Sequence, residues 1–219
     1  MTETTWLIAT ILLAYLLGSV PTAVWVGKWF YGADVRDFGS GNAGATNTFR
    51  VLGRSAGIIV MLVDVLKGTA AAAFANVLLD AGMVAPGSLT FWQIVLGITA
   101  ILGHIFPVFA QFRGGKGVAT MVGMIFTVQL EIALICIGIF FVVLLATHYV
   151  SLGSIIASLA FPFLLMLPQF EAGSLDVATQ SISFGLFAIV VITHTKNIKR
   201  LVAGNENKSV IRIRKKPVA

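Results

Sequence analysis

The chain has 219 residues, of which 58% are hydrophobic and 11% charged, and its net charge is +6. Soluble domains carry about 25% charged residues, so this composition excludes a soluble globular protein. We expect an all-α integral membrane protein. It should form a single domain over residues 1–219, because no repeat, linker or low-complexity tract divides the chain.

Six apolar stretches predict membrane-spanning helices. In chain order they are 6–26, 57–79, 91–109, 117–149, 152–167 and 177–193. A helix needs about 17 to 25 residues to cross the hydrocarbon core, so the fourth stretch is long for one span and short for two. The first stretch begins after Glu3 rather than after basic residues, which distinguishes it from a cleavable signal peptide.

The basic residues decide how often the fourth stretch crosses. All of the 15 Lys and Arg residues except Lys67 lie in the blocks 28–54, 113–116 and 196–216. Basic loops favour the cytoplasmic side, and these blocks share one side only if 117–149 crosses twice, turning near Glu131. The sequence therefore predicts seven transmembrane helices, with the N-terminus outside and the C-terminus in the cytoplasm. Two of the seven would be short or strongly tilted.

The first polar stretch, 34–50, reads DVRDFGSGNAGATNTFR and suggests anion binding. Its candidate ligands are Ser40, Gly41, Asn42, Gly44, Thr46, Asn47 and Arg50. Glycines let backbone N–H groups converge on an anion, and a helix N-terminus adds more. A helix that begins near Thr46 and Asn47 would place both on one face with Arg50. Ser, Thr and Asn are also common helix N-caps, but so many in one membrane loop favour binding over capping.

The second polar stretch, RGGKG at 113–117, resembles a nucleotide-binding loop only superficially. Lys116 is followed by Gly117 instead of Ser or Thr, and Ala110 occupies the place of the leading glycine. We therefore set nucleotide binding aside. Because Gly115 and Gly117 flank Lys116, this lysine can approach a phosphate as a point charge while the backbone comes close.

The third polar stretch, 194–208, places His194, Asn197 and Arg200 at spacing three. A continuous helix would make them neighbours on one face. A histidine at this boundary can serve as a base, as a donor to an oxyanion or as an interfacial residue. Lys196 and Lys199 are interpreted as ordinary anchoring charges.

Two ionisable residues, Asp64 and Lys67, lie deeper, within the second apolar stretch. At spacing three they can pair, as a functional site or as a structural salt bridge, and the sequence leaves both open. His104 and His148 lie at the ends of spans without comparable polar neighbours and are interpreted as structural.

A metal site is not expected. The segment DVRD offers Asp34 and Asp37, but no second acidic pair or histidine accompanies them, which argues against a two-metal centre. The single cysteine, Cys136, provides neither a disulfide nor a metal cluster.

Taken together, three segments resemble the signature segments of the bacterial PlsY family, the acyl-phosphate:glycerol-3-phosphate acyltransferases. They are DVRDFGSGNAGATN followed by Arg50, GGKG, and HTKNIKRL followed by GNENK. The resemblance covers nearly the whole chain, with the segments in the family's order, spacing and sidedness. It implies a seven-helix enzyme of the bacterial cytoplasmic (inner) membrane, with its active site facing the cytoplasm.

The resemblance also implies the reaction. A fatty acyl group passes from acyl phosphate to the 1-hydroxyl of glycerol 3-phosphate, giving lysophosphatidic acid and inorganic phosphate, as the first acylation of phospholipid synthesis. No metal, other cofactor, acyl-CoA or acyl carrier protein is implied, and no nucleic acid partner. An upstream enzyme that forms acyl phosphate would supply the donor, and the sequence does not identify it.

Site roles follow from this resemblance and the residues together. The ligands in 34–50, with the glycines around Lys116, would hold phosphate. Lys116 would neutralise the acyl phosphate and the departing phosphate. His194 and Asn197 would orient the attacking hydroxyl or the acyl carbonyl, and Arg200 would reach the second phosphate. The proton acceptor stays open between the substrate's phosphate and His194.

Two other classes of membrane protein would account for part of this pattern. A transporter of phosphorylated metabolites would also use basic groups, and the pair Asp64 and Lys67 speaks for it. However, the polar residues crowd one predicted face, and no paired half-repeats are visible. A structural membrane subunit would leave the three polar stretches unexplained.

Overall fold

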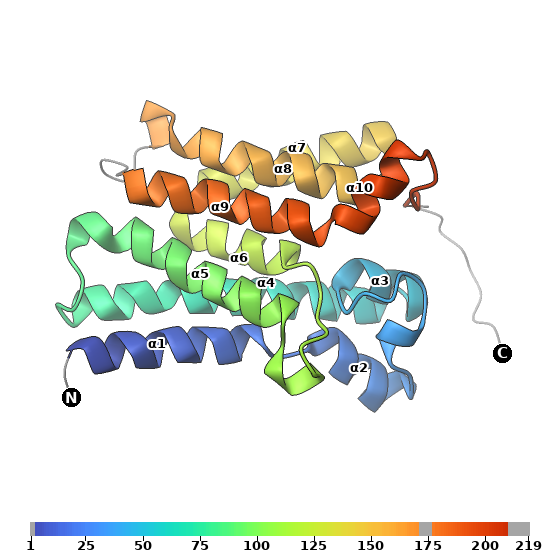
Figure 1. The fold of residues 1–219 in the computed structure, drawn as a ribbon, viewed down its shortest axis with the longest axis horizontal. Coiled ribbons are helices and arrows are strands. Elements are labelled where there is room, and N and C mark those ends of the chain that lie inside the picture. Colours follow the sequence, from blue (N-terminus) through green and yellow to red (C-terminus); the bar gives the residue numbers. More distant parts are fainter. Residues whose placement is uncertain (1–2, 171–176, 210–219) are drawn as a thin grey trace.

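Figure 1 shows the computed structural model of the chain, which describes residues 3–170 and 177–209. Every regular element in these ranges is a helix, as the composition predicts. The α-helices are α1 Glu3–Gly18, α2 Thr22–Tyr31, α3 Ala45–Val51, α4 Arg54–Asp80, α5 Leu89–Ile105, α6 Val118–Val128, α7 Leu130–Thr147, α8 Val150–Leu165, α9 Val177–Thr193 and α10 Thr195–Val202. Short 3₁₀ helices cover Val35–Asp37, Pro86–Ser88, Val108–Ala110 and Pro168–Phe170.

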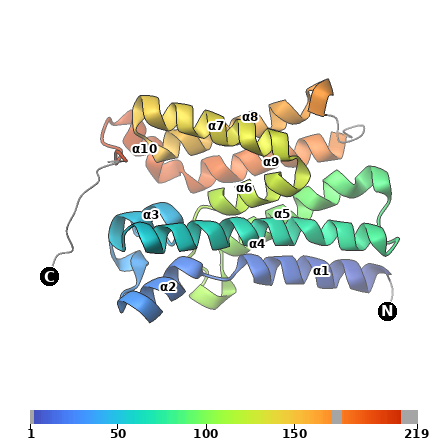
Figure 2. The same cartoon turned by 180° about the vertical axis from the view of Figure 1, so that it is seen from behind.

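The long helices lie side by side along a common direction, and consecutive ones run back and forth (Figures 1 and 2). Large apolar side chains such as Leu12, Leu66 and Val142 are exposed on the outside of this bundle. A bundle whose outer surface is this apolar suits lipid rather than water. The chain is an integral membrane protein.

By length and composition, four segments are able to cross a membrane. They are Glu3–Tyr31, Arg54–Asp80, Pro86–Ala110 and Leu130–Thr147. A fifth is present if α9 and α10, which are bent by 63° relative to each other, count as one span. The apolar helices α6 and α8 have only 11 and 16 residues. Seven spans, and the orientation of the two termini, therefore stay predictions.

The fourth apolar stretch is divided into two helices close to the expected place. α6 ends at Val128, α7 begins at Leu130, and Gln129 between them is extended, with φ −160° and ψ 109°. The Gln129 side chain donates a hydrogen bond of 3.0 Å to Glu131. The break next to Glu131 is thus confirmed.

The first apolar stretch lies within the candidate span Glu3–Tyr31, as expected, but a break divides it into two helices. α1 ends at Gly18 and α2 begins at Thr22, with Pro21 as its N-cap residue. Proline has no N–H and cannot continue the hydrogen bonding of the preceding helix. The break exposes the Val20 carbonyl, which accepts a hydrogen bond of 3.0 Å from Lys67.

Close backbone approach joins α4 to α6. A Cβ atom at Gly123 would lie 1.9 Å from the Val65 carbonyl oxygen, and one at Gly68 would lie 2.0 Å from that of Thr120. Thr69 also donates a hydrogen bond of 2.9 Å to the Gly123 carbonyl. Glycine lets the backbones of two membrane helices come this close together, and any side chain at these two positions would force the helices apart.

Replacing Gly123 with alanine should therefore destabilise the protein. The added methyl group overlaps backbone, which cannot move aside as a flexible side chain can. We expect the free energy of unfolding to fall by about 1–3 kcal/mol, the usual effect of overpacking. Thermal unfolding in detergent measures it. Gly138→Ala is the control, because its Cβ has no heavy atom within 4 Å in the described chain. Equal stability of the two variants would contradict the close packing.

Candidate active site

The three polar stretches lie toward the same end of the bundle. Figures 1 and 2 show the α3 region, the loop between α5 and α6, and α10 all at this end, away from the N-terminus. Hydrogen bonds connect them in pairs. Arg36 of the first stretch donates to the carbonyls of Ala110, just before the second stretch, at 2.9 Å and of Arg113, within it, at 3.4 Å. Lys116 of the second stretch donates to the Asn197 side chain of the third. Residues from the beginning, middle and end of the chain therefore form one assembly.

Lys116 is the centre of this assembly. Its ammonium group donates to Oδ1 of Asn197, while its carbonyl accepts a hydrogen bond of 3.4 Å from Thr193. The pKa of Lys116 is lowered to about 8, mainly by burial; the nearby positive charges of Arg200 and Arg50 contribute to the decrease, and Glu206 opposes it. A lysine crowded by two arginines gains stability from a bound anion, because the anion relieves the repulsion.

Glu206 was not among the predicted site residues, yet it organises the third stretch. Its carboxylate accepts hydrogen bonds from Asn197 at 2.6 Å, from Nε of Arg200 at 2.6 Å and from Ser151 at 3.0 Å. Burial raises the pKa of Glu206, but these three hydrogen bonds outweigh burial and the pKa lies below its usual value. The only sequence signal was a single carboxylate, in GNENK, within a basic segment.

The helix α10 presents the side chains that Glu206 holds. As predicted, Asn197 and Arg200 share one helical face, and both contact the same carboxylate. Arg200 uses Nε for Glu206, so only its terminal NH₂ groups are available for a substrate phosphate. Asn197 in turn connects Glu206 to Lys116.

His194 lies at the bend between α9 and α10 and is buried. Its Nδ1 is 2.8 Å from the Val190 carbonyl oxygen. A carbonyl only accepts, so Nδ1 carries the proton and Nε2 of the neutral ring is left as an acceptor. The tautomer therefore suits a role in orienting or receiving a hydroxyl proton.

In the first stretch, the predicted short helix is present as α3, with Gly44 as its N-cap residue. In the described chain no side-chain hydrogen bond caps the N-terminus of this helix. Ser40, Asn42 and Thr46 therefore do not serve as its caps. Ser40, Thr46 and Arg50 are exposed, and Asn42 is partly buried. They are accessible to a ligand.

Asn47 departs from its expected place beside Thr46 and Arg50. Its side chain is buried and fastens the loop: Nδ2 donates to the carbonyls of Val35 at 2.8 Å and Phe38 at 3.1 Å, and Oδ1 accepts from the Ser40 N–H at 2.9 Å. This correction has a physical reason, since a buried amide must satisfy its donors and acceptor, and the loop backbone supplies all three partners. Asn47 holds Ser40 in place.

The two glycines that flank Lys116 have different structural roles: Gly115 packs the loop onto α5, and Gly117 begins α6. The N–H group of Gly115 donates to the His104 carbonyl at 3.1 Å, so it is not free for a phosphate, contrary to expectation. A Cβ at Gly115 would lie 2.1 Å from Nε2 of His104, so this glycine packs the loop onto α5. Gly117, with φ of +82°, occupies the left-handed region and is the N-cap residue of α6.

The expectation that His104 lacks polar neighbours is wrong. Its Nδ1 lies 3.5 Å from Oδ1 of Asp64, which also pairs with Lys67 at 2.8 Å and accepts from Thr22 at 3.4 Å. All of these side chains are buried. The sequence could not show this, because α5 meets α4 only in the folded protein. The cluster joins α2, α4 and α5, which supports the structural interpretation of the Asp64–Lys67 pair.

No group of three or more His, Cys, Asp and Glu side chains within 3–170 and 177–209 is arranged to hold a metal ion. The described site consists instead of three cationic side chains, Lys116, Arg50 and Arg200, with one carboxylate, Glu206. Such an excess of positive charge is suited to phosphate groups.

Comparison with known proteins supplies the family. The family model described as glycerol-3-phosphate acyltransferase matches residues 8–204. Among relatives of that name, the protein of Macrococcus caseolyticus is 44% identical and covers 90% of this chain and 94% of its own. That of Chlorobaculum tepidum is 41% identical, with 92% and 95% covered, and glycerol-3-phosphate acyltransferase 2 of Bacillus anthracis is 44% identical, with 93% and 99% covered.

Two solved structures are similar to the fold. Both are of PlsY, an integral membrane glycerol 3-phosphate acyltransferase, and both are 36% identical in sequence and cover 92% of this chain and 94% of their own. The glycerol 3-phosphate form has a TM-score of 0.80, and the lysophosphatidic acid form has 0.76.

Proposed function

The chain belongs to the glycerol-3-phosphate acyltransferase family, and we propose that it transfers a fatty acyl group from acyl phosphate to the 1-hydroxyl of sn-glycerol 3-phosphate. The products are lysophosphatidic acid and inorganic phosphate. That the chain is an acyltransferase follows from its family. The acyl-phosphate donor and the roles of the individual residues are the proposal. As members of the family are enzymes, the transporter and structural-subunit alternatives fall away.

One observation carries this proposal: Lys116 is hydrogen-bonded to Asn197 where the polar stretches meet, and the charges of Arg200 and Arg50 are near enough to lower its pKa. Donor and acceptor each bring one phosphate, so two anionic groups must be accommodated together. A single carboxylate, Glu206, neutralises only part of this positive charge. The two solved PlsY structures are a glycerol 3-phosphate form and a lysophosphatidic acid form. These two compounds are the acceptor and the product of the reaction proposed here.

In the reaction, the 1-hydroxyl oxygen forms a bond to the acyl carbonyl carbon, and the bond from this carbon to the phosphate oxygen breaks. The leaving phosphate takes the electron pair, and Lys116 stabilises its growing charge. Phosphate is a good leaving group, so the alignment of the two substrates supplies much of the rate. The hydroxyl proton passes to a phosphate oxygen or to Nε2 of His194. A His194→Ala variant with turnover within a few-fold of the parent would assign it to phosphate.

For the membrane arrangement, we propose seven spanning helices in one domain over 1–219, α1, α4, α5, α6, α7, α8 and α9, with α6 and α8 tilted or buried. The membrane is the bacterial cytoplasmic membrane, the active site faces the cytoplasm, and an enzyme that forms acyl phosphate acts upstream. Membrane-impermeant maleimide labelling tests the orientation with cysteines at Ser40 and Lys196 in a Cys136→Ala background. Both sites must react only in inverted vesicles.

The activity is tested with purified protein in detergent, palmitoyl phosphate and glycerol 3-phosphate. Lysophosphatidic acid and inorganic phosphate should appear in equal amounts, and only when both substrates are present. Palmitoyl-CoA should not replace palmitoyl phosphate. Phosphate release without glycerol 3-phosphate would indicate a hydrolase, and acylation from palmitoyl-CoA alone would refute the proposed donor.

A pH dependence follows from the pKa of Lys116, which is lowered to about 8. Lys116 must be protonated to stabilise phosphate, so kcat/KM should fall as pH rises through about 8 and approach a tenfold loss per pH unit. Bound phosphate favours the charged lysine, so kcat should fall only at higher pH. Initial rates across pH measure both profiles. In Lys116→Arg, residual activity should lack this alkaline decrease, because arginine stays charged. A parent profile that is flat to pH 10 would contradict this role.

A further inference from the structure

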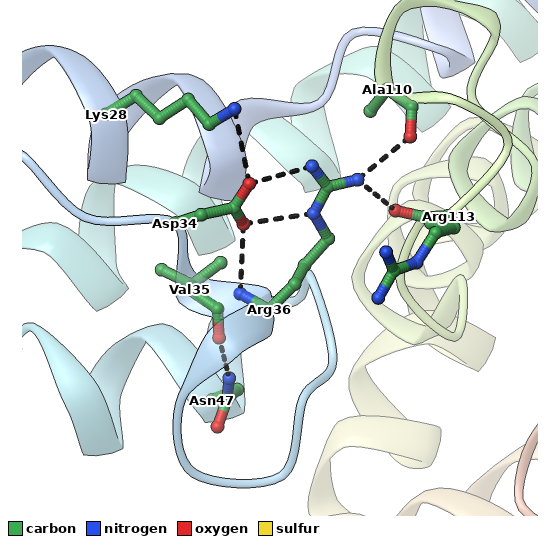
Figure 3. Close-up of polar contacts among 7 residues, drawn as sticks. All are labelled: Lys28, Asp34, Val35, Arg36, Asn47, Ala110 and Arg113. Carbon is green, nitrogen blue, oxygen red and sulfur yellow. Dashed lines mark hydrogen bonds and ion pairs between the residues drawn. The ribbon is translucent and has the colours of Figure 1, made fainter.

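The guanidinium group of Arg36 lies between the first and second polar stretches (Figure 3). Its Nε and Nη2 donate to the two carboxylate oxygens of Asp34 at 3.0 and 2.7 Å. Its Nη1 donates to the backbone carbonyls of Ala110 at 2.9 Å and Arg113 at 3.4 Å. The side chain is 9% exposed. One planar group thus connects two loops that are more than 70 residues apart in the sequence.

Asp34 fixes the direction of this guanidinium. It also accepts a hydrogen bond of 3.0 Å from the Arg36 N–H and pairs with the more exposed Lys28 at 3.3 Å. The hydrogen bond from the Arg36 side chain holds the pKa of Asp34 well below its usual range. The carboxylate therefore stays charged at neutral pH, and Nη1 is directed at the second loop.

The two carbonyls that receive Nη1 flank a strained turn. Between them, Gln111 and Phe112 have φ of 59° and 58°, a left-handed conformation that residues other than glycine rarely adopt. Two such residues in succession persist only where the surroundings hold the backbone in place. Arg36 holds both ends of this turn, and the Phe112 N–H is tied to the Pro107 carbonyl at 2.9 Å.

This turn leads directly to Lys116. Following Arg113, the N–H groups of Gly114 and Gly115 donate to the carbonyls of Ile105 and His104, each at 3.1 Å, and Lys116 comes next. On the other side, Val35 precedes Arg36 and its carbonyl is held by Asn47 (Figure 3). A shift of the guanidinium would therefore move both loops relative to each other.

We propose that Arg36 is a positioning residue for acyl transfer: held by Asp34, it fixes the turn before Lys116 against the loop that carries Ser40. The two loops then hold the phosphate groups of the two substrates at a fixed distance from each other and in a fixed relative orientation. This inference rests on the proposed function. Arginine is required because only a planar group with five donors bonds two carboxylate oxygens and two carbonyls at once, which a lysine cannot do.

Kinetics in the detergent assay test the inference. In Arg36→Lys, kcat should fall about 100-fold, the loss expected when a catalytic group is misplaced by about 1 Å. KM should change less, because the proposed phosphate ligands are all retained. Asp34→Asn should lose about tenfold, because Arg36 stays but loses its orientation. Arg113→Gln is the matched control: it removes an exposed arginine from the same turn but keeps the carbonyl, and it should stay within about threefold of the parent.

Hydrogen exchange distinguishes positioning from other roles. The amides of Phe112, Gly114 and Gly115 should exchange faster in Arg36→Lys than in the parent or in Arg113→Gln, with the rest of the bundle unchanged. Parent-like turnover in both Arg36→Lys and Asp34→Asn would overturn the proposal. So would a loss of turnover with unchanged exchange at these amides. If Arg36→Lys does not fold, Asp34→Asn decides by the same two measurements. A parent that forms no lysophosphatidic acid would refute the proposed function, while the exchange comparison still tests whether Arg36 holds the turn before Lys116.

Discussion

Replacing Lys116 with alanine is expected to lower kcat by about 10²- to 10³-fold, the usual loss when one preorganised group that stabilises developing charge is removed. The donor's phosphate carries more negative charge when it leaves than when it is bound as acyl phosphate. An ammonium group at this position therefore acts mainly on the transition state, and KM should change less than kcat. Initial-rate kinetics with palmitoyl phosphate and glycerol 3-phosphate measure both constants.

Lys196→Ala is the matched control for this variant. Lys196 is an exposed lysine on α10, next in sequence to Asn197, and its removal takes away the same charge near the site. Turnover should stay within about twofold, because an isolated surface charge contributes little. If both lysine variants lose activity to the same extent, the effect belongs to net charge rather than to the position of Lys116. Parent-like turnover of Lys116→Ala would remove Lys116 from the mechanism.

Replacing Glu206 with glutamine is expected to impair both stability and activity. The carboxylate accepts three hydrogen bonds, and an amide has only one acceptor oxygen to offer in their place. Losing hydrogen bonds to a charged group costs about 1.5–3 kcal/mol each, so the free energy of unfolding should fall by roughly 3 kcal/mol. Asn197 would lose its fixed orientation toward Lys116, and kcat should fall at least about tenfold.

The pH dependence of thermal unfolding provides a second test of the role of Glu206. The pKa of Glu206 is lowered in the folded protein, so its contribution to stability is present above the unfolded pKa and is lost as pH falls through the folded one. Thermal unfolding of the parent should therefore shift more with acidification than that of Glu206→Gln. Glu131→Gln makes the same chemical change at an exposed residue beside the break between α6 and α7 and should match the parent. Identical unfolding of all three proteins would contradict the anchoring role.

The structure also distinguishes residues that hold the site from residues that face a substrate. Asn47 and Gly115 were expected to bind phosphate, but their polar groups are committed to the protein's own backbone. Arg36 and Glu206 were given no role from the sequence and yet connect the loops. Polar residues of one type thus serve either purpose, and only their partners in the folded chain tell the two apart.

Several properties could be predicted from the sequence alone, because they depend on local composition and periodicity. The apolar stretches determine a helical membrane protein, the polar break beside Glu131 divides the fourth stretch, and the spacing within 194–200 places Asn197 and Arg200 on one helical face. The three signature segments are enough to identify the family, since each is short, continuous and specific.

Other properties were decided only by tertiary structure, because they join groups that are far apart in the chain. The Lys116–Asn197–Glu206 network, the contact of His104 with Asp64 and the bridge from Arg36 to Ala110 each depend on how separate helices pack. Periodicity predicts the face on which a side chain lies but not the neighbour that this face meets. A buried polar group then takes whichever partner the packing brings within hydrogen-bonding distance, since leaving it unpaired is costly.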